Sequence, residues 1–373
     1  MPVVTPGSTD EVAEVMRDAA ARKLTVVPTG RGTKLGWGLP VDPDLHVDLS
    51  GMGKVLDHQA GDLIVDVQAG VRLSDLQQTV GAAEQRLLVD ETVPGATIGG
   101  TVATNASGPR RLVAGTARDL LIGVTVVRAD GVVARAGGRV VKNVAGYDLG
   151  KLMVGSFGTL AVVTEAVFRL HPVPEARRWV GVDVDTAERA HDVTHAVVHS
   201  QLVPAAVEVE WPAEGGGTVV VEIAGRSEGV ARRVRDLEEI LGGATVADVE
   251  PATWSSYPWT SGSTGLKLTC VLSGLRDVLT VAREVGAHVR GSSGAGVLYA
   301  ALEDADAVPG ALARLREVCA RHEGTVVVVD APSEVKRAVD VWGPIPALDL
   351  MRRVKQQFDP DHRLSPGRFV GGL

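Results

Sequence analysis

Residues 28–38 read PTGRGTKLGWG, a glycine-rich stretch typical of a phosphate-binding loop. It fits neither of the two best-known patterns of that kind. A dinucleotide fingerprint G-x-G-x-x-G that begins at Gly30 would require glycine where Leu35 stands. A Walker loop would close on Gly-Lys followed by Ser or Thr, whereas here Gly36 precedes Trp37. Because a tight turn also explains most Gly-x-Gly sequences, the role of this loop depends on what the rest of the chain supplies.

The loop follows a short strand. Ser8, Thr9 and Asp10 offer N-caps to apolar residues at helical spacing, so the sequence predicts a helix at the start of the chain. The β-rich run 23–27 comes next and stops at Pro28. The loop is therefore expected at the carboxyl end of a strand, where open α/β sheets usually bind their ligands.

The composition is that of an ordinary soluble protein with two or three domains: 373 residues, 45% hydrophobic and 23% charged. A formal net charge of −8 argues against a general nucleic-acid binder. Cys270 and Cys319 are the only cysteines, so neither a disulfide framework nor a cysteine-ligated cluster is expected, and a reducing cytoplasm is the predicted location. No apolar run reaches the roughly 18–20 residues that cross a bilayer, and we see no signal peptide; association with a membrane through a partner stays open.

Two further segments are rich in glycine and small residues. Residues 93–108 read VPGATIGGTVATNASG, and residues 155–165 read GSFGTLAVVTE. Glycine lets backbone N–H groups point into a concavity without a Cβ in the way. A surface loop has no need of such small residues, but a path pressed against a large planar ligand does. Three such segments in the first half of the chain favour a large, phosphate-bearing ligand.

The remaining pattern predicts an α+β protein. Residues 121–137 read as a hairpin that turns at Asp130-Gly131, residues 159–170 as a buried strand, and Pro172 and Pro174 as a domain boundary. Two rounds of strands and helices follow, which is typical of an antiparallel sheet with helices on one face. A last amphipathic helix precedes the C-terminus. The predicted domains are therefore 1–175, 176–335 and 336–373.

The three segments, in this order, resemble the FAD-binding domain of the vanillyl-alcohol oxidase/PCMH flavoprotein superfamily. A narrower resemblance rests on SGPRRLVAGTARDLLIGV (107–124), GGRVVKNVAGYDLGKLMVGSFGTLAVVTE (137–165) and FDPDHRLSPGRF (358–369). These stretches are similar to the family of FAD-binding subunits of glycolate oxidases. The resemblance implies an α+β fold, with a PCMH-type two-subdomain FAD-binding domain, an α+β (ferredoxin-like) cap domain, and a C-terminal segment that returns to the FAD domain.

The resemblance also implies a set of FAD-binding residues in all three segments. In the first segment, the backbone amides of residues 29–34 would cradle the pyrophosphate. The implied residues are Pro28, Thr29, Gly30, Arg31, Gly32, Thr33 and Lys34, then Pro94, Gly95, Thr97, Ile98, Gly99, Gly100, Thr104, Asn105 and Ser107, and finally Gly158, Thr159, Leu160, Val162 and Val163. Several relatives tether the flavin through a histidine just after the loop glycines; here that stretch has neither histidine nor cysteine, so a non-covalent FAD is expected.

Flavin enzymes that oxidise 2-hydroxy acids need a general base and a cation near the flavin. Relatives that act on such acids bind a metal through a cap-domain motif with glycine, aspartate and two histidines. The comparable stretch RGSSGAGVLYAAL (290–302) contains no histidine, Asp or Glu, and His288 stands alone upstream. No metal site is therefore predicted. His191, His195 and His199 share one helix face at a spacing that can ligate a metal, but a solvated helix face is the favoured interpretation.

The other candidates leave the catalytic residues unknown. Lys142, Arg110, Arg111 and Arg118 each offer a cation for the flavin or an ordinary surface charge. Tyr147 and Asp148 are expected to position the third segment. His362 and Ser365 depart from the family's usual C-terminal pattern, in which asparagine precedes Pro-Gly.

Two functions stay open. The first is an FAD-dependent oxidoreductase within a glycolate (2-hydroxy acid) oxidase or dehydrogenase complex. Electrons would pass to an iron–sulfur partner beside a sister flavin subunit, since two cysteines cannot hold a cluster. The second is a non-catalytic flavin-carrying or scaffolding subunit whose sister chain carries the chemistry. An NAD-dependent Rossmann enzyme is set aside because Leu35 breaks its fingerprint.

Overall fold

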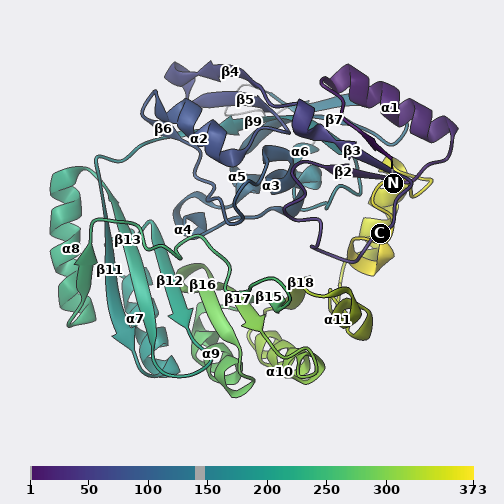
Figure 1. The fold of residues 1–373 in the computed structure, drawn as a ribbon. Coiled ribbons are helices and arrows are strands. Elements are labelled where there is room, and N and C mark those ends of the chain that lie inside the picture. The colour runs from purple at the N-terminus through teal and green to yellow at the C-terminus, as the bar shows by residue number, and fades with distance from the viewer. Residues whose placement is uncertain (1, 139–147) are drawn as a thin grey trace. The chain divides into compact units, whose positions relative to one another are not determined.

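The computed structural model describes residues 2–138 and 148–373, and the described residues fall into two units (Figure 1). Unit 1 comprises Met1–Ser107, Gly115–Val173 and Pro344–Leu373, and unit 2 comprises Gly108–Ala114 and Pro174–Gly343. Residues 108–114 thus leave the domain in which the sequence-based limits had placed them. The physical reason is Arg110, whose guanidinium forms ion pairs with Glu222 and Glu250 of unit 2.

The first helix of unit 1 is α1 (Thr9–Ala21), and the Ser8 hydroxyl caps it by accepting a hydrogen bond from the Glu11 N–H at 3.2 Å. A small parallel sheet follows in the order β1-β3-β2. Its strands are β1 (Val3–Val4), β2 (Val26–Thr29) and β3 (Leu45–Asp48). Gly30 comes directly after β2, which confirms that the glycine loop lies at the carboxyl end of a strand.

A second, antiparallel sheet of unit 1 has the order β4-β5-β9-β7-β8. Its strands are β4 (Val55–Gln59), β5 (Ile64–Gln68), β7 (Leu121–Val127), β8 (Val133–Gly137) and β9 (Val162–Arg169). The predicted hairpin β7–β8 and the predicted buried strand β9 are confirmed. Gly131 adopts φ +77°, a left-handed conformation that the hairpin turn requires. Strand β9 lies in the middle of the sheet and is almost fully buried.

Neighbouring residues of β9 face opposite sides of the sheet, as the period of a strand requires. On one side, the Thr9 hydroxyl of α1 donates to the Thr164 hydroxyl at 3.0 Å. On the other side, β9 packs against helix α3. The further elements of unit 1 are α2 (Leu73–Gly81), α3 (Ile98–Thr104), α5 (Ala117–Leu120), α6 (Gly150–Met153), α12 (Leu348–Phe358), β6 (Gln85–Arg86), β10 (His171–Pro172), η1 (Leu49–Gly51), η2 (Ala60–Asp62) and η5 (Val370–Gly372).

The last segment of the chain, which contains α12 (yellow in Figure 1), folds back onto unit 1. Leu364 forms a parallel bridge with Val26 of β2. From α12, the Lys355 ammonium is only 1% exposed and donates to the carbonyl of Thr159 at 2.7 Å. The segment thus fixes both the strand that carries the glycine loop and the turn before β9.

Unit 2 consists of two βαββαβ repeats that share one antiparallel sheet, in the order β14-β11-β13-β12-β16-β17-β15-β18. The two repeats meet where β12 pairs with β16. The first contains β11 (Ala176–Val184), α7 (Ala187–Val198), β12 (Ala206–Trp211), β13 (Gly217–Gly225), α8 (Ser227–Leu241) and β14 (Thr245–Ala247). The second contains β15 (Thr264–Thr269), α9 (Leu275–Glu284), β16 (His288–Ser292), β17 (Val297–Leu302), α10 (Val308–Arg321) and β18 (Val326–Asp330). Shorter pieces are α4 (Arg111–Ala114), α11 (Ser333–Ala338), η3 (Leu272–Gly274) and η4 (Ser293–Ala295).

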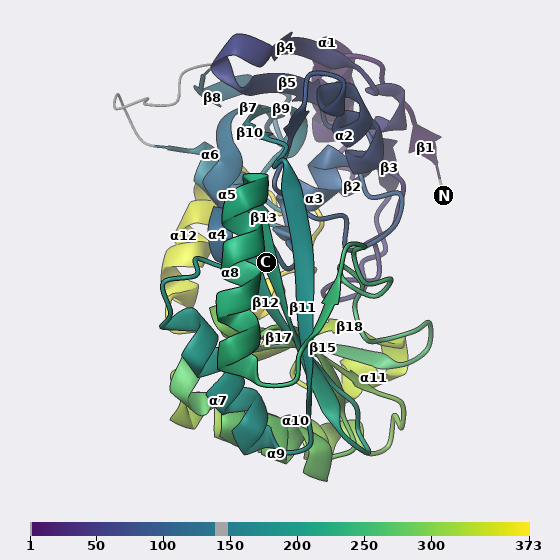
Figure 2. The same ribbon diagram turned by 90° about the vertical axis from the view of Figure 1, so that its left-hand side faces the viewer.

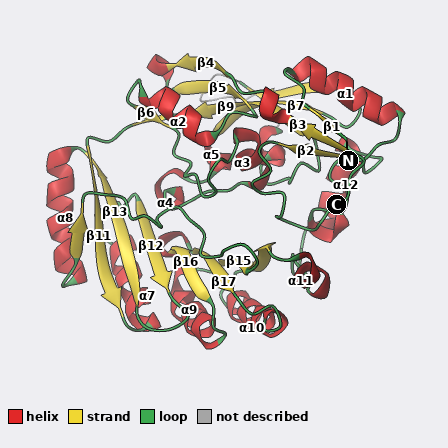
Figure 3. Cartoon of the chain, in the orientation of Figure 1, coloured by secondary structure: helices red, strands yellow, loops and turns green. Residues whose placement is uncertain are grey.

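Helices α7–α10 form one layer on one side of this sheet (Figure 3), and α8 lies along β11 and β13 (Figure 2). Apolar residues alternate with glutamates along β12, so one face of the strand is apolar and the helices cover that face. Val207 and Val209 are buried, and Trp211 of the same face is fully buried, with its indole N–H donating to the Leu279 carbonyl of α9 at 3.1 Å. Glu208 and Glu210 take the opposite face. The predicted α+β fold, with a PCMH-type FAD-binding domain and an α+β (ferredoxin-like) second domain, is confirmed.

Candidate cofactor site

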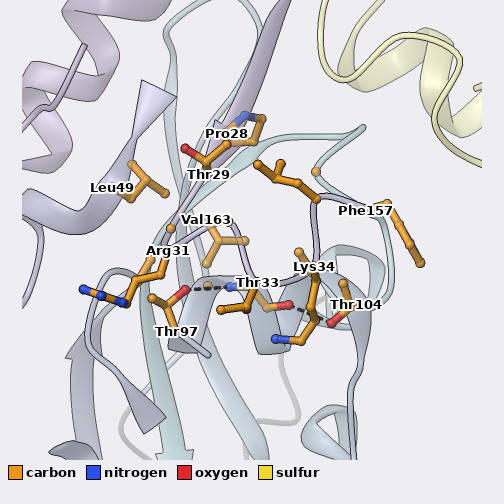
Figure 4. A pocket seen from close by; sticks show the side chains of 18 of the residues that line it. Pro28, Thr29, Arg31, Thr33, Lys34, Leu49, Thr97, Thr104, Phe157 and Val163 are labelled. Carbon is orange, nitrogen blue, oxygen red and sulfur yellow. Dashed lines mark hydrogen bonds between the residues drawn. The ribbon is translucent and has the colours of Figure 1, made fainter. Parts of the chain in front are cut away.

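A pocket in unit 1 gathers residues from the glycine loop, helix α3, the turn before β9 and the C-terminal segment (Figure 4). It contains about 730 Å³ of empty space, its open mouth included. Among the described residues, its lining carries three cationic side chains, those of Arg31, Lys34 and Arg368, and no carboxylate. The rest of the lining is small or apolar. Such a pocket suits a ligand with an anionic part and a flat apolar part.

Two loop glycines are needed for different reasons. At Gly30, an added Cβ would lie 2.3 Å from Oγ1 of Thr97, so the loop and the start of α3 approach too closely for any side chain. Thr97 is itself fixed, because its hydroxyl accepts from the Gly100 N–H at 3.3 Å and caps α3. Gly32 has φ +72°, which residues other than glycine adopt at a cost. The first glycine therefore brings two cofactor segments together, and the second shapes the loop.

The backbone of the loop is arranged as an anion site. None of the N–H groups of residues 30–34 donates a hydrogen bond within the described part of the chain. The carbonyls of the same loop are held from behind: Arg368 donates to those of Lys34, Leu35 and Trp37 at 2.9, 3.0 and 3.2 Å. Consecutive unengaged N–H groups form a concavity that binds anions.

Lys34 adds a full positive charge to this concavity. Its side chain is 6% exposed, and its Nζ has no hydrogen-bond partner among the described residues. An added Cβ on Gly100 would lie 3.9 Å from this nitrogen, which places the ammonium beside the first turn of α3. Burial lowers the pKa of Lys34 to about 8, against a smaller raising effect of Glu91. Burial likewise lowers the pKa of Arg368 to about 10.

The pocket brings together most of the residues expected to bind the cofactor. All of the predicted FAD-binding residues of the first segment line the pocket, whereas only some of those in the second and third segments do. Those that line it are Pro28, Thr29, Gly30, Arg31, Gly32, Thr33, Lys34, Thr97, Gly99, Gly100, Thr104, Gly158 and Val163. Those outside its lining are Pro94, Gly95, Ile98, Asn105, Ser107, Thr159, Leu160 and Val162.

Several of the outlying residues also have structural roles. Asn105 ends α3 in the left-handed conformation, at φ +51°, a usual C-cap geometry for asparagine. Ile98 is 1% exposed and belongs to the core. Thr159 has its hydroxyl turned to the carbonyl of Ser156 at 2.7 Å. Val162 is fully buried and lies out of phase with Ala161 and Val163, which face the pocket.

Sequence reasoning missed other lining residues. They are Leu35, Leu49, Ala69, Ala103, Ser156, Phe157, Ala161 and Arg368. The period of a strand could have identified Ala161 from Val163. Arg368 had no local signal, because it lies 334 residues after Lys34, whose carbonyl it binds.

The arginines proposed from the sequence as cations near the flavin lie elsewhere or are engaged. Arg110 is 8% exposed and paired with Glu222 at 3.0 Å in unit 2. Arg111 donates to the Tyr299 hydroxyl at 2.9 Å, also in unit 2. Arg118 is exposed in unit 1, outside the pocket lining. Asp148 is exposed and near Lys151, and both Lys142 and Tyr147 lie outside the described residues.

The histidines do not assemble a catalytic or metal centre in the described ranges. The rings of His191 and His195 lie 5.8 Å apart and those of His195 and His199 4.0 Å apart, on one face of α7. No three His, Cys, Asp or Glu side chains in residues 2–138 and 148–373 are grouped to hold a metal ion. His288 pairs with Glu210, and His362 is exposed. Ser365 is fully buried, with its Cα in the left-handed region at φ +43°.

Neither cysteine is activated. Burial raises the pKa of Cys270 to about 11 and that of Cys319 to about 12, so both remain thiols at neutral pH. Among the helices that the structure describes, none combines the length and the apolar character needed to cross a membrane.

Comparison with known families accounts for this geometry. Residues 2–137 match the family described as FAD binding domain, and residues 343–369 match the family described as FAD linked oxidases, C-terminal domain. Residues 2–137 are therefore an FAD-binding domain of the PCMH type, and residues 343–369 correspond to the end of an FAD-linked oxidase. The cofactor of the chain is FAD.

Among individual relatives, the chain is similar to the glycolate oxidase subunit GlcD of Bacillus subtilis, at 26% identity over 98% of this chain and 88% of the relative. It is similar to a D-lactate dehydrogenase of Anaerostipes hadrus, at 37% identity over 47% of this chain and 37% of the relative. It is also similar to a D-2-hydroxyglutarate dehydrogenase of Xanthomonas citri pv. viticola, at 39% identity over 46% of this chain and 37% of the relative. The last two matches span little more than a third of those relatives' own length.

Among solved structures, alkyldihydroxyacetonephosphate synthase matches this fold with a TM-score of 0.72, covering 98% of this chain and 75% of that one. The two sequences are 18% identical, so this likeness concerns the fold.

The pocket fits FAD by its own chemistry. The diphosphate of FAD is anionic, and the concavity of residues 30–34 offers N–H donors with the Lys34 ammonium beside them. The isoalloxazine ring is flat and largely apolar, and the small residues Ala103, Ala161 and Val163 leave a smooth wall. These residues accommodate the cofactor that the family carries.

Proposed function

We propose that this chain is the FAD-binding subunit of an oxidoreductase complex that oxidises a small 2-hydroxy acid such as glycolate or D-lactate. The observation that carries the proposal is the cationic pocket of small residues in unit 1, taken with a similarity to a glycolate oxidase subunit that runs over 98% of the chain. Two shorter similarities, to a D-lactate and a D-2-hydroxyglutarate dehydrogenase, support the same substrate class.

In this proposal, the backbone of residues 29–34 and the ammonium of Lys34 hold the diphosphate. Gly99, Gly100 and Val163 line the flat part of the cofactor. FAD, when bound, supplies an acceptor for two electrons and a proton equivalent from the substrate carbon. The chain binds and orients the cofactor and excludes water from its apolar side. The loop has no histidine or cysteine to tether FAD, so the bond to the chain is non-covalent.

Electrons would leave through an iron–sulfur partner. Cys270 and Cys319, with their raised pKa values, are poor ligands for a cluster, and a cluster needs about four thiolates. A sister flavin subunit completes the complex in this proposal.

A second function is favoured by a specific observation. Among the residues that the structure describes, the pocket lining contains no histidine, tyrosine, aspartate or glutamate to take the proton of the substrate hydroxyl. A non-catalytic subunit that carries FAD, with the chemistry in a sister chain, needs no such base.

One experiment separates the two. The purified full chain is made anaerobic, its flavin spectrum is recorded, and glycolate, D-lactate or D-2-hydroxyglutarate is added, with L-lactate as the control of opposite configuration. Loss of the flavin absorption band with one of the D-acids or glycolate supports catalysis in this chain. A bound flavin that no acid reduces supports the carrier, and a chain that binds no flavin contradicts both. Precipitation with trichloroacetic acid tests the linkage, since colour left in the pellet would contradict a non-covalent flavin.

A further inference from the structure

Lys34 is unusual among the lysines that the structure describes, because its ammonium group is buried with no hydrogen-bond acceptor among those residues. Its side chain is among those that line the pocket in Figure 4. The Trp37 ring lies on its other side, with the ring centroid 6.0 Å from Nζ. A buried cation is costly unless an anion compensates for it, so the position calls for a negatively charged ligand in the pocket.

The charged groups around Lys34 can be named element by element. On its own loop lies Arg31, and from the C-terminal segment comes Arg368, which donates to the Lys34 carbonyl at 2.9 Å. The one acidic group that raises its pKa is Glu91, from the segment before α3. Glu91 is already engaged, since its carboxylate accepts from the Gly95 N–H at 2.9 Å. The net charge of the groups around Lys34 is therefore positive.

The same concavity contains the unengaged N–H groups of residues 30–34. These donors and the ammonium both select for anionic oxygen, and they lie on one short loop. In FAD, only the diphosphate carries formal negative charge. A ligand group with two linked phosphates satisfies the amides and the ammonium together.

We propose that the Lys34 ammonium is the counter-ion of the FAD diphosphate, and that FAD binding is coupled to protonation of Lys34. The proposal rests on the assignment of the loop to the diphosphate made above. It goes beyond that assignment because it gives the side chain, and not only the backbone, a role, and because it makes cofactor retention depend on pH.

The direction of the coupling follows from the burial of Lys34. In the flavin-free protein the pKa of Lys34 is about 8, and a neighbouring diphosphate raises that pKa in the complex. Well below pH 8 the lysine is protonated in both states, so binding takes up no proton from it. Above pH 8 the free lysine is neutral, binding takes up close to one proton, and affinity falls by about tenfold per pH unit. The pKa of Arg368, lowered to about 10, places its own titration above this range.

The test measures FAD binding to the flavin-stripped full chain by isothermal titration calorimetry from pH 7 to 9.5, in pairs of buffers with different ionisation enthalpies. Wild type should take up about one proton at the upper end and none at pH 7. Lys34→Met should bind FAD about ten- to a hundredfold more weakly at pH 7, with no proton uptake, as expected for a lost charge-assisted contact. Lys34→Arg should keep most of the affinity, because its charge does not titrate in this range.

Two controls make the result specific. Lys54→Met removes an exposed lysine of unit 1 that does not line the pocket, and it should behave as wild type. Riboflavin, which lacks both phosphates, should bind wild type and Lys34→Met equally at every pH. Circular dichroism of each variant verifies the fold.

Three outcomes would overturn the proposal. If Lys34→Met weakens riboflavin as much as FAD, the ammonium faces the ring system instead. If wild type binds FAD without proton uptake above pH 8, Lys34 is not the counter-ion. A wild-type chain that binds no FAD at all contradicts the proposed function as well, so the two failures are distinguishable.

Discussion

The buried ion pair between Lys355 and Asp359 allows a quantitative test of how the C-terminal segment holds the cofactor domain. Lys355 Nζ lies 2.7 Å from Asp359 Oδ2, with side-chain exposures of 1% and 0%. The same ammonium donates to the carbonyls of Thr159 and Leu364, at 2.7 and 3.1 Å. The perturbation is Lys355→Met, which keeps the length of the side chain and removes its charge.

The expected cost is large because one charge stays behind. Asp359 would keep two donors, the N–H groups of Arg363 and Leu364, but would lose the ammonium paired with it. Breaking a buried pair on one side typically costs about 3–5 kcal/mol. For a domain of this size, that corresponds to a fall of roughly 6–20 °C in the melting temperature of unit 1.

The assay is thermal release of bound FAD, followed by the rise in flavin fluorescence. The double variant Lys355→Met/Asp359→Asn should recover part of the loss, because it leaves no unpaired buried charge while the amide oxygen can still accept from the N–H groups of Arg363 and Leu364. Burial lowers the pKa of Lys355 even beside Asp359, which indicates that desolvation outweighs their attraction.

A matched exposed pair provides the control. Arg22 and Asp18 of α1 are also at i and i+4, at 3.1 Å, but both are 63% exposed. Arg22→Met should change stability by less than about 0.5 kcal/mol. The reasoning is refuted if Lys355→Met costs less than about 1 kcal/mol, or if the double variant is as unstable as the two single variants added together.

Three further outcomes are expected. Gly30→Ala places a methyl group against Thr97, so it should destabilise unit 1 by about 1–3 kcal/mol. It should also lower FAD occupancy, which is measured by flavin absorbance per chain. Unchanged occupancy and stability would contradict the close approach of Gly30 and Thr97. Arg368→Met releases three loop carbonyls and should raise the dissociation constant of FAD by roughly tenfold or more, whereas exposed Arg352→Met should not, as equilibrium dialysis would measure. In the flavin-free chain, Lys34→Met should be more stable than wild type by up to about 3 kcal/mol at pH 7, since the pKa of Lys34 falls from 10.5 to about 8 on folding. Because the depressed pKa disfavours the folded state only while the unfolded lysine is charged, this difference should shrink between pH 8 and 10.5; urea titrations at pH 7 and 10 that show the same difference would refute it.

The fold could be predicted from local patterns to a considerable degree. The β-rich run before Pro28 predicted the end of β2, and the Asp130-Gly131 turn predicted the β7–β8 hairpin. Both predictions were possible because the backbone geometry there depends on a few neighbouring residues. Alternating strands and helices after residue 180 predicted the layered sheet of unit 2, since each strand must bury one face.

What local patterns could not give was the long-range pairing. Residues 108–114 join unit 2 because Arg110 meets Glu222 and Glu250, which lie 112 and 140 residues later. In β9 both faces are buried, so alternation alone could not say that Val163 faces the pocket and Val162 does not. The glycine loop was identified from the sequence, but the reason for Gly30 depends on Thr97, a contact that only the folded chain reveals.

The attachment of Arg368 to the glycine loop has a consequence for how the protein is made. The carbonyls it holds belong to Lys34, Leu35 and Trp37, and 334 residues separate it from the first of these. During synthesis, the loop leaves the ribosome long before the side chain that braces it, and translation proceeds at about 5–20 residues per second. For tens of seconds the nascent loop therefore lacks its brace. Flavin capture in its final geometry is then a late event, completed only when the far end of the chain folds back.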